Sequence, residues 1–193
     1  TLITPVYADK LLKNGFLNLM KQRIYGIETE YGLLVKDPEF RLNQVDVALR
    51  IKNHIFGARK LGLLDLHYRA NDEPPGNGGF LANGGRLYLD MGHLEYASPE
   101  CCNLVDLVTF DRAGDCIVQE ALEELDWAEQ VSIIKNNVDL ETNATFGCHE
   151  NYLVSRAFQF DNRESLKLLS SFLVTRQIYC GAGRVGACNP HPF

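Results

Sequence analysis

The stretch QRIYGIETEYGLLV, residues 22–35, decides the fold of this chain. It mixes β-branched and aromatic residues, which is typical of a strand. Side chains on a strand point alternately to opposite faces, so Glu28 and Glu30 share one face while Ile27 and Tyr31 share the other. We expect the apolar face to pack against helices, which leaves both carboxylates on the open face of a sheet.

Helical and strand-like segments follow each other without strict βαβ alternation. Apolar periodicity and turn residues predict helices over residues 43–58, 103–125 and 162–179 and further strands over 86–91, 131–138 and 146–157. Residues 71–85 hold two Pro and five Gly and predict a loop. We therefore predict an α+β fold in which helices pack on one face of a largely antiparallel sheet.

Each expected helix has an apolar face. Asn43 and Asn103 are each followed by Asp three residues later, an arrangement that caps helix N-termini. Apolar residues at helical spacing are expected to be buried: Val45, Ala48, Ile51 and Ile55 in the first helix, Leu104, Leu107, Val108, Ile117, Ala121 and Leu125 in the second, and Leu166, Leu169, Phe172 and Leu173 in the third.

Composition and charge exclude several classes of protein. The 193 residues are 46% hydrophobic and 23% charged, which indicates one compact domain, or one and a half, and argues against disorder. The net charge of −6 argues against a general nucleic-acid binder, which needs a basic surface. No apolar run approaches the roughly 20 residues that cross a bilayer, so no membrane partner is expected.

The cysteines and the N-terminal segment suggest the compartment. Six cysteines in 193 residues do not make a disulfide scaffold, and the lack of a CxxC pair argues against a structural zinc site. We expect reduced, mostly buried thiols in a cytoplasmic protein.

Residues 1–20 superficially resemble a targeting segment, but Asp9, Lys10 and Lys13 interrupt the apolar stretch. We therefore expect an N-terminal extension that lies outside the core.

A second predicted strand adds polar side chains to the open face. Arg86, Tyr88 and Asp90 alternate with leucines, and Glu95 follows shortly after. Clustered carboxylates raise one another's pKa unless a cation lies between them, and Mg²⁺ prefers oxygen ligands and binds substrate phosphates. Arg86 suits a phosphate because its guanidinium is a planar fork. The pattern indicates a magnesium–nucleotide site, with a merely solvated sheet face as the alternative.

Two other motifs need separate interpretation. Residues 181–186, GAGRVG, match GxGxxG, but a dinucleotide fingerprint needs a following helix and the chain ends seven residues later, so we interpret them as a loop. Cys148 and His149 are neighbours on a predicted strand and therefore point to opposite faces, which argues against a Cys–His nucleophile. We expect Cys148 in the core and His149 on the polar face, as a contact to nucleotide or substrate or as a structural histidine.

Six motifs, in order along the chain, resemble the family of Pup ligases and depupylases: GIETEYG (26–32), NGGRLYLDMGHLEYASPE (83–100), DRAG (111–114), KNNVD (135–139), GCHENYL (147–153) and FLVTRQIYCGAGRVG (172–186). These enzymes act on the prokaryotic ubiquitin-like protein Pup and are relatives of glutamine synthetase. The resemblance implies a curved, mainly antiparallel sheet of the glutamine-synthetase type. It also implies three parts of the chain: an N-terminal extension over residues 1–20, the N-terminal part of the catalytic domain over 21–187, and a tail over 188–193.

The resemblance implies a site for ATP and Mg²⁺ with assigned roles: Glu28, Tyr88 and Glu95 as metal ligands, Arg86 and Ser98 as ATP contacts, and Asp90 as the catalytic carboxylate. The implied enzyme is an ATP-dependent ligase that joins the C-terminal Glu side chain of Pup to a lysine of a protein substrate, which tags that protein for proteasomal degradation. The alternatives are a depupylase or Pup deamidase of the same family and an inactive fragment that only binds a partner. Leu94 stands where the family usually has Pro, and family members continue well beyond these motifs.

Overall fold

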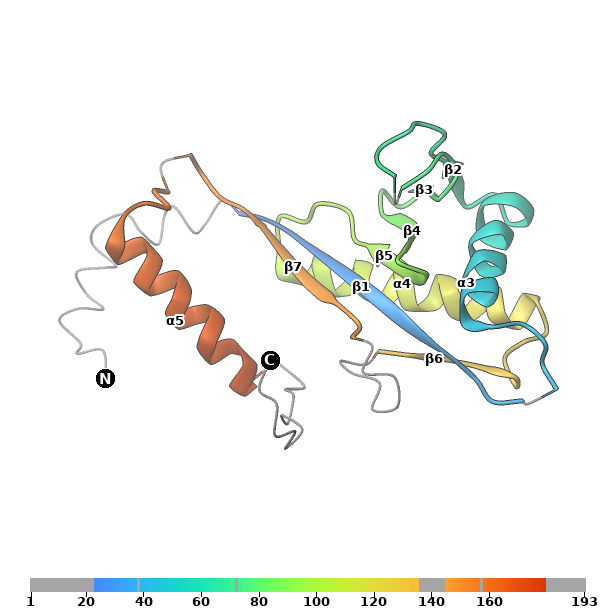
Figure 1. The fold of residues 1–193 in the computed structure, drawn as a ribbon. Helices are drawn as coiled ribbons and strands as arrows, with labels where there is room; N and C mark the ends of the chain where they lie inside the picture. The colour runs from blue at the N-terminus through green and yellow to red at the C-terminus, as the bar shows by residue number, and fades with distance from the viewer. Residues whose placement is uncertain (1–22, 38, 72, 136–144, 157, 180–193) are drawn as a thin grey trace. The chain divides into compact units, whose positions relative to one another are not determined.

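The computed structural model describes residues 23–37, 39–71, 73–135, 145–156 and 158–179. The chain divides into two compact units, of which one comprises residues 24–136 and 146–153 and the other residues 1–23, 137–145 and 154–193. The first unit holds the sheet with the helices α3 and α4, and the second holds the helix α5, Arg163–Tyr179 (Figure 1).

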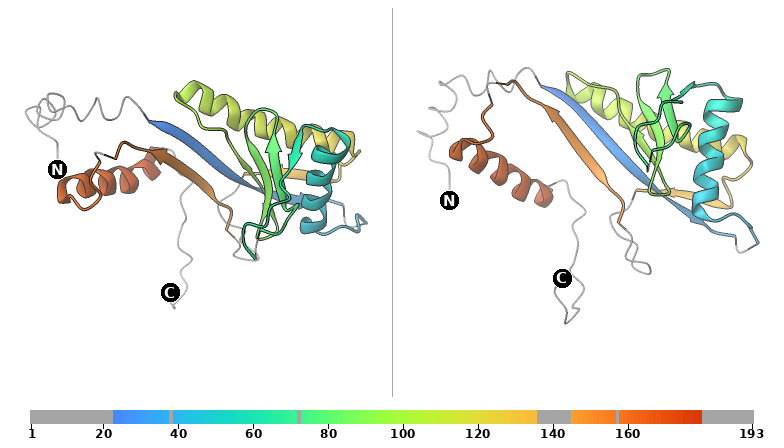
Figure 2. Two further views of the ribbon diagram at one scale, coloured as in Figure 1. Left: turned by 90° about the horizontal axis from the view of Figure 1, so that it is seen from above. Right: turned by 45° about the horizontal axis from the view of Figure 1, so that its top comes forward.

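Seven strands form one open sheet within the described residues, and all of their pairings are antiparallel. They are β1 (Ile24–Val35), β2 (Gly62–Leu64), β3 (Gly78–Leu81), β4 (Arg86–Asp90), β5 (His93–Ala97), β6 (Val131–Ile134) and β7 (Cys148–Leu153). The strand order is β2-β3-β4-β5-β1-β6, and β7 also pairs with β1. The long β1 strand lies beside β7 along its first half and beside β6 along its second half, as Figure 2 shows.

Two capped helices belong to the sheet unit. The helix α3 spans Gln44–Asn53 and continues into a π-helical turn, His54–Ala58, while α4 spans Leu104–Glu124. The side chain of Asn43 accepts a hydrogen bond from Asp46 N at 2.9 Å, and Asn103 accepts one from Asp106 N at the same distance. Each cap satisfies a backbone donor that the first helical turn leaves free, so both predicted caps are confirmed.

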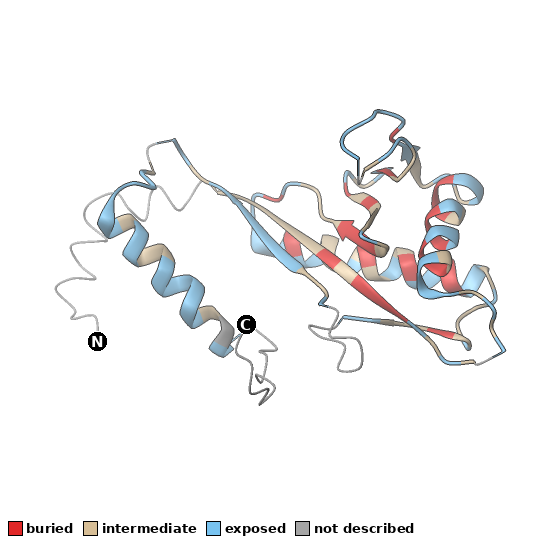
Figure 3. Ribbon diagram, in the orientation of Figure 1, coloured by how far each residue is buried: buried red, intermediate tan, exposed pale blue. Residues whose placement is uncertain are grey.

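The core lies between one face of the sheet and the helices α3 and α4 (Figure 3). Buried apolar side chains come from both layers: Tyr31, Leu33, Leu87, Leu94 and Tyr96 from the strands, and Val47, Ile51, Val118, Ala121 and Leu122 from the helices. Because the strand residues alternate with polar neighbours, the opposite face of the sheet stays free of these helices. The predicted α+β fold with helices on one face of an antiparallel sheet is thereby confirmed.

A glycine sets how closely α4 approaches the sheet. A Cβ atom on Gly114 would lie 2.3 Å from Cδ1 of Tyr96, which is far inside van der Waals contact. The buried Tyr96 ring therefore occupies the space that a side chain at Gly114 would need. The DRAG motif thus contributes a packing position to the fold.

The expected helix faces are wrong at several residues. Val45 is 52% exposed, Leu104 is 62% exposed and Val108 is 60% exposed. The buried faces run through neighbouring positions, including Val47 in α3 and Val118 in α4. Apolar residues occupy two adjacent stripes on both helices, so spacing alone cannot select the stripe that meets the sheet.

Three strands lie outside the predicted ones. The strand β3, Gly78–Leu81, falls inside the predicted loop over 71–85, and β2 and β5 lie outside every predicted element. A Cβ atom on Gly78 would lie 2.2 Å from Cβ of Tyr88, so the glycine allows β3 and β4 to approach. Glycine has low strand propensity, which is why local composition indicated a loop instead.

The remaining expectations have mixed outcomes. Cys101 is buried, but Cys102, Cys116 and Cys148 are exposed, so the expectation of mostly buried thiols is wrong for the described cysteines. The helix over 162–179 is confirmed as α5, although Leu166, Phe172 and Leu173 on its expected buried face are more than 40% exposed.

Several predicted segments lie outside the described residues: the extension over 1–20, the GxGxxG segment, most of KNNVD and the tail. In the described part of the chain, every helix is too short or too polar to span a membrane.

Candidate functional site

Strand register brings the predicted site residues onto one face of the sheet. Glu95 on β5 lies opposite Tyr88 on β4 and opposite Glu30 on β1, so these three side chains form a row across the sheet. In the adjacent row, Glu28 lies opposite His149 on β7. On the other side of β1, Glu28 lies opposite Ala97 on β5, and Ala97 lies opposite Arg86 on β4.

The neighbouring residues of β1 show that this face is the one away from α4. The hydroxyl of Thr29 donates to Asp111 Oδ1 at 3.2 Å, and the hydroxyl of Tyr31 donates to Asp115 Oδ1 at 3.0 Å. Both aspartates lie on α4. The predicted alternation of Glu28 and Glu30 against Tyr31 is therefore confirmed.

Two groups of potential cation ligands share the buried Glu95. One group consists of Glu28, Glu95 and His149, and the other of Glu30, Asp90 and Glu95. Within each group, the candidate ligand atoms all lie within 4.8 Å of one another. The carboxylates that the sequence placed on two separate strands thus converge around one side chain.

Glu95 shows how well this cluster suits a cation. Its side chain is buried, and Oε1 has no hydrogen-bond partner among the described residues. Burial, together with repulsion from Glu28 and Glu30, raises the pKa of Glu95 to about 7. A buried carboxylate oxygen without a hydrogen bond is costly unless it is protonated or binds a cation. The oxygen-rich donor set fits Mg²⁺.

Tyr88 and Arg86 flank the carboxylates on β4. The Tyr88 hydroxyl is hydrogen-bonded to Glu95, and burial followed by repulsion from Glu95 and Glu28 raises the pKa of Tyr88. The phenol therefore stays protonated and offers a neutral oxygen to a cation. The Cζ atom of Arg86 lies 4.4 Å from the Tyr88 ring centroid, and its Nη2 atom donates to Glu73.

A tight hairpin turn positions Asp90. Asp90 ends β4 opposite His93, and the two residues between them, Met91 and Gly92, have φ angles of 46° and 93°. Positive φ at both central residues is typical of the two-residue turns that match strand twist. The turn therefore holds Asp90 close to Glu30 and Glu95, the other two members of the second ligand group.

Two histidines lie against the glutamates of β1. Nδ1 of His149 is 3.2 Å from Glu28 Oε2 and 3.9 Å from Glu95 Oε1. Nδ1 of His93 is 3.1 Å from Glu30 Oε2. The expected polar-face position of His149 is confirmed, whereas Cys148 is exposed and not part of the core. Sequence reasoning missed His93, although its spacing of two residues from Glu95 would have placed both on one strand face.

Ser98 is hydrogen-bonded to two backbone groups. Its Oγ accepts a hydrogen bond from Ile27 N at 3.0 Å and donates to Pro99 O at 3.1 Å. Ser98 and Glu28 both line a cavity of about 430 Å³ at the end of β1. In the described residues, Ser98 therefore has a structural role between β1 and β5 and also borders open space beside Glu28.

Comparison with known proteins identifies the family. A model of the Pup-ligase protein family matches residues 23–192. The chain belongs to this family. It is 41% identical over 180 residues to a Pup–protein ligase of Corynebacterium glutamicum, covering 89% of this chain and 34% of that protein. It is 43% identical over 183 residues to a Pup–protein ligase of Kocuria rhizophila, covering 90% of this chain and 35% of that protein.

A solved structure supports both the family and the fold. The crystal structure of the complex between the prokaryotic ubiquitin-like protein Pup and its ligase PafA matches with a TM-score of 0.65 and 39% sequence identity. The match covers 89% of this chain and 33% of that one. The chain thus spans about a third of the length of the Pup ligases that it matches.

Proposed function

We propose that this chain supplies the magnesium–nucleotide site of an ATP-dependent Pup–protein ligase. The reaction would join the C-terminal Glu side chain of Pup to a lysine of a protein substrate in the cytoplasm. The observation that carries the proposal is the buried oxygen of Glu95, which has no hydrogen-bond partner among the described residues and lies among the carboxylates of Glu28, Glu30 and Asp90. The names of the related Pup–protein ligases support the substrate.

Three side chains of the cluster would hold Mg²⁺: Glu28, Tyr88 and Glu95. A divalent cation would neutralise the repulsion that raises the pKa of Glu95. It would also bring nucleotide phosphates to the sheet face, because Mg²⁺ commonly binds protein carboxylates and phosphates together. Arg86 would bind a phosphate through its planar guanidinium, and Ser98 would contact the nucleotide at the neighbouring cavity.

Asp90 would act on the attacking lysine. A carboxylate is a poor acyl donor. ATP would supply a phosphoryl group to the Pup carboxylate, with the bond to the terminal phosphorus of ATP breaking and ADP leaving, which would give an acyl phosphate. The lysine nitrogen then forms a bond to the acyl carbon while the bond from that carbon to the phosphate oxygen breaks. Lysine is mostly protonated at neutral pH, since its ordinary pKa is about 10.4. Asp90 would accept the proton and so free the lone pair.

The substitution Asp90→Asn tests this role. The variant is expected to retain binding of Mg²⁺ and ATP, because Asp90 is not among the proposed ligands, and to lose conjugation of Pup. Binding is measured by calorimetry and conjugation by the appearance of a heavier substrate band on a gel. Unchanged conjugation would exclude Asp90 as the base. Release of Pup from a preformed conjugate, without any conjugation, would favour the depupylase alternative.

A further inference from the structure

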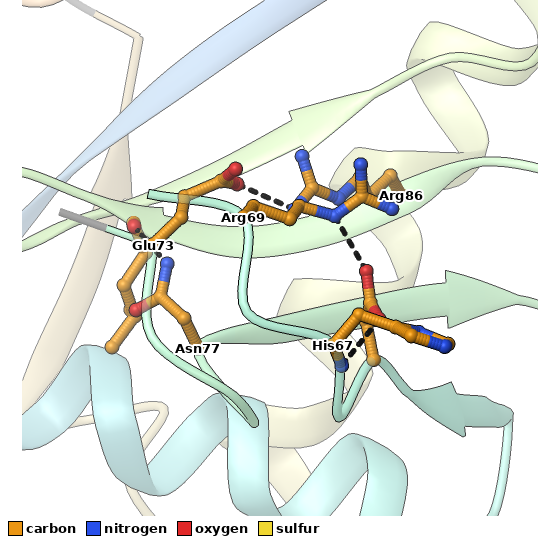
Figure 4. A network of polar contacts seen from close by, with 7 residues as sticks. His67, Arg69, Glu73, Asn77 and Arg86 are labelled. Atoms are coloured by element: carbon orange, nitrogen blue, oxygen red, sulfur yellow. Dashed lines mark hydrogen bonds and ion pairs between the residues drawn. The ribbon is translucent and has the colours of Figure 1, made fainter. Parts of the chain in front are cut away.

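The loop between β2 and β3, residues 65–77, extends one acidic side chain to the proposed phosphate-binding arginine. Arg86 Nη2 donates to the Glu73 carboxylate, as the close view in Figure 4 shows. Both side chains are largely shielded, with exposures of 21% for Arg86 and 25% for Glu73. The contact therefore joins the loop to the sheet face that carries the carboxylate cluster.

The two ends of this loop are held in place without Glu73. At the first end, the backbone N–H of Asp65 donates to Gly78 O at 2.8 Å, and the Asp65 carboxylate accepts from Arg69 Nε at 2.6 Å. At the second end, the buried Lys52 donates to Gly76 O at 2.6 Å, and the Asn77 side chain donates to Leu89 O at 2.7 Å. The ends are therefore anchored to the helix α3 and to the strands β3 and β4.

The middle of the loop depends on Glu73. Among the described residues from 70 to 75, the other hydrogen bonds all join two residues of the loop itself. For example, the backbone N–H of Glu73 donates to Ala70 O at 3.1 Å, and the Tyr68 hydroxyl donates to the Asn71 side chain. Breaking the contact with Arg86 would therefore free the middle of the loop and leave its ends in place. Such a segment opens at low energetic cost because few contacts hold it.

Arg86 uses only part of its guanidinium in this contact. Its Nε atom is buried and has no hydrogen-bond partner among the described residues. A phosphate group has enough oxygens to accept hydrogen bonds from Nε and Nη2 at the same time. The Glu73 carboxylate accepts from Nη2 and leaves Nε without a hydrogen bond within the described part of the chain. A phosphate and the Glu73 carboxylate would repel each other at the same guanidinium, so they exclude one another.

We propose that Glu73 occupies the phosphate subsite at Arg86 as an internal oxyanion, and that a nucleotide phosphate displaces it and releases the middle of the loop. This inference rests on the proposed function, because it assigns Arg86 to a nucleotide phosphate. Glu73 thereby competes with the nucleotide. The apparent affinity for phosphate is reduced by the fraction of molecules in which Arg86 is occupied.

The substitution Glu73→Gln tests the competition, with Glu129→Gln as a control that removes an equal charge from an exposed position. Calorimetric titrations with inorganic tripolyphosphate and with ATP, each with Mg²⁺, measure affinity. We expect Glu73→Gln to bind both about fivefold or more tightly than the parent chain, and the control to change less than about twofold. Amide hydrogen exchange over residues 66–75 is expected to rise in Glu73→Gln without ligand, and in the parent chain when tripolyphosphate binds.

The outcomes separate this inference from the ligase proposal. Equal affinity in Glu73→Gln and the parent chain would overturn the competition, and weaker binding would show that Glu73 orients Arg86 instead. Tighter tripolyphosphate binding together with absent Pup conjugation would support the competition and contradict the ligase proposal. Conjugation by the parent chain, with unchanged loop exchange in Glu73→Gln, would support the ligase proposal alone.

Discussion

The stability of the metal-free chain should fall as the pH rises through neutrality, because Glu95 must ionise inside the carboxylate cluster. Its pKa rises from an ordinary value of 4.5 to about 7, first through burial and then through repulsion from neighbours such as Glu28 and Glu30. The folded state therefore holds this proton more tightly than the unfolded state. The contribution to stability is fully present below about pH 4.5 and is lost as the pH passes about 7.

The pKa values give the size of the effect. The difference between 4.5 and about 7 corresponds to roughly 3 kcal/mol of stability lost when Glu95 ionises. The substitution Glu95→Gln removes this ionisation while keeping nearly the same shape. At about pH 8 without metal, the variant is expected to be more stable than the parent chain by up to roughly 3 kcal/mol, and at about pH 4 by much less.

Denaturant unfolding at several pH values, with a chelator and then with Mg²⁺, measures both effects. Mg²⁺ is expected to stabilise the parent chain at about pH 8 and to have little effect on Glu95→Gln, which lacks the buried charge. The exposed substitution Glu129→Gln serves as a control and should follow the parent chain at every pH. If the stabilities of Glu95→Gln and the parent chain change in parallel with pH, Glu95 does not titrate in the cluster.

Four further substitutions test separate parts of the structure. Tyr88→Phe removes the hydrogen bond that lowers the pKa of Glu95, so the pH midpoint of the stability loss should move upward; a downward shift would contradict the contact. Gly114→Ala should destabilise the chain by about 1–3 kcal/mol in denaturant unfolding, because its Cβ would lie 2.3 Å from Tyr96 Cδ1; a stabilised variant would show that α4 lies farther from the sheet. Asn103→Ala should cost about 1 kcal/mol through loss of the α4 cap, and Asn43→Ala should cost a similar amount through loss of the α3 cap. Unchanged unfolding midpoints would show that water satisfies those backbone donors equally well.

Local pattern was sufficient to predict which side chains share a face. The alternation along β1 placed Glu28 and Glu30 together and Tyr31 opposite, and the structure confirms this with the contact of Tyr31 to α4. The caps at Asn43 and Asn103 were likewise predictable, because a cap depends on residues only three positions apart. These features follow from backbone geometry within one element, which neighbouring residues control.

Packing between elements was harder to predict. The buried stripe of α3 passes through Val47 and not Val45, because contact with the sheet selects between two apolar stripes. The strand β3 was missed because Gly78 and Gly79 favour turns in isolation. Their lack of a side chain instead permits close approach of the adjacent strands.

The order of residues along the chain was enough to predict that one strand face is acidic and that the opposite face packs against helices. It was also enough to indicate the family to which the motifs belong. The convergence of the ligands required the folded sheet. Glu28 and His149 are 121 positions apart and meet only because β7 pairs with β1 in one particular register. Register depends on hydrogen bonds between distant strands, and a slip by one residue would turn every side chain of a strand to the other face.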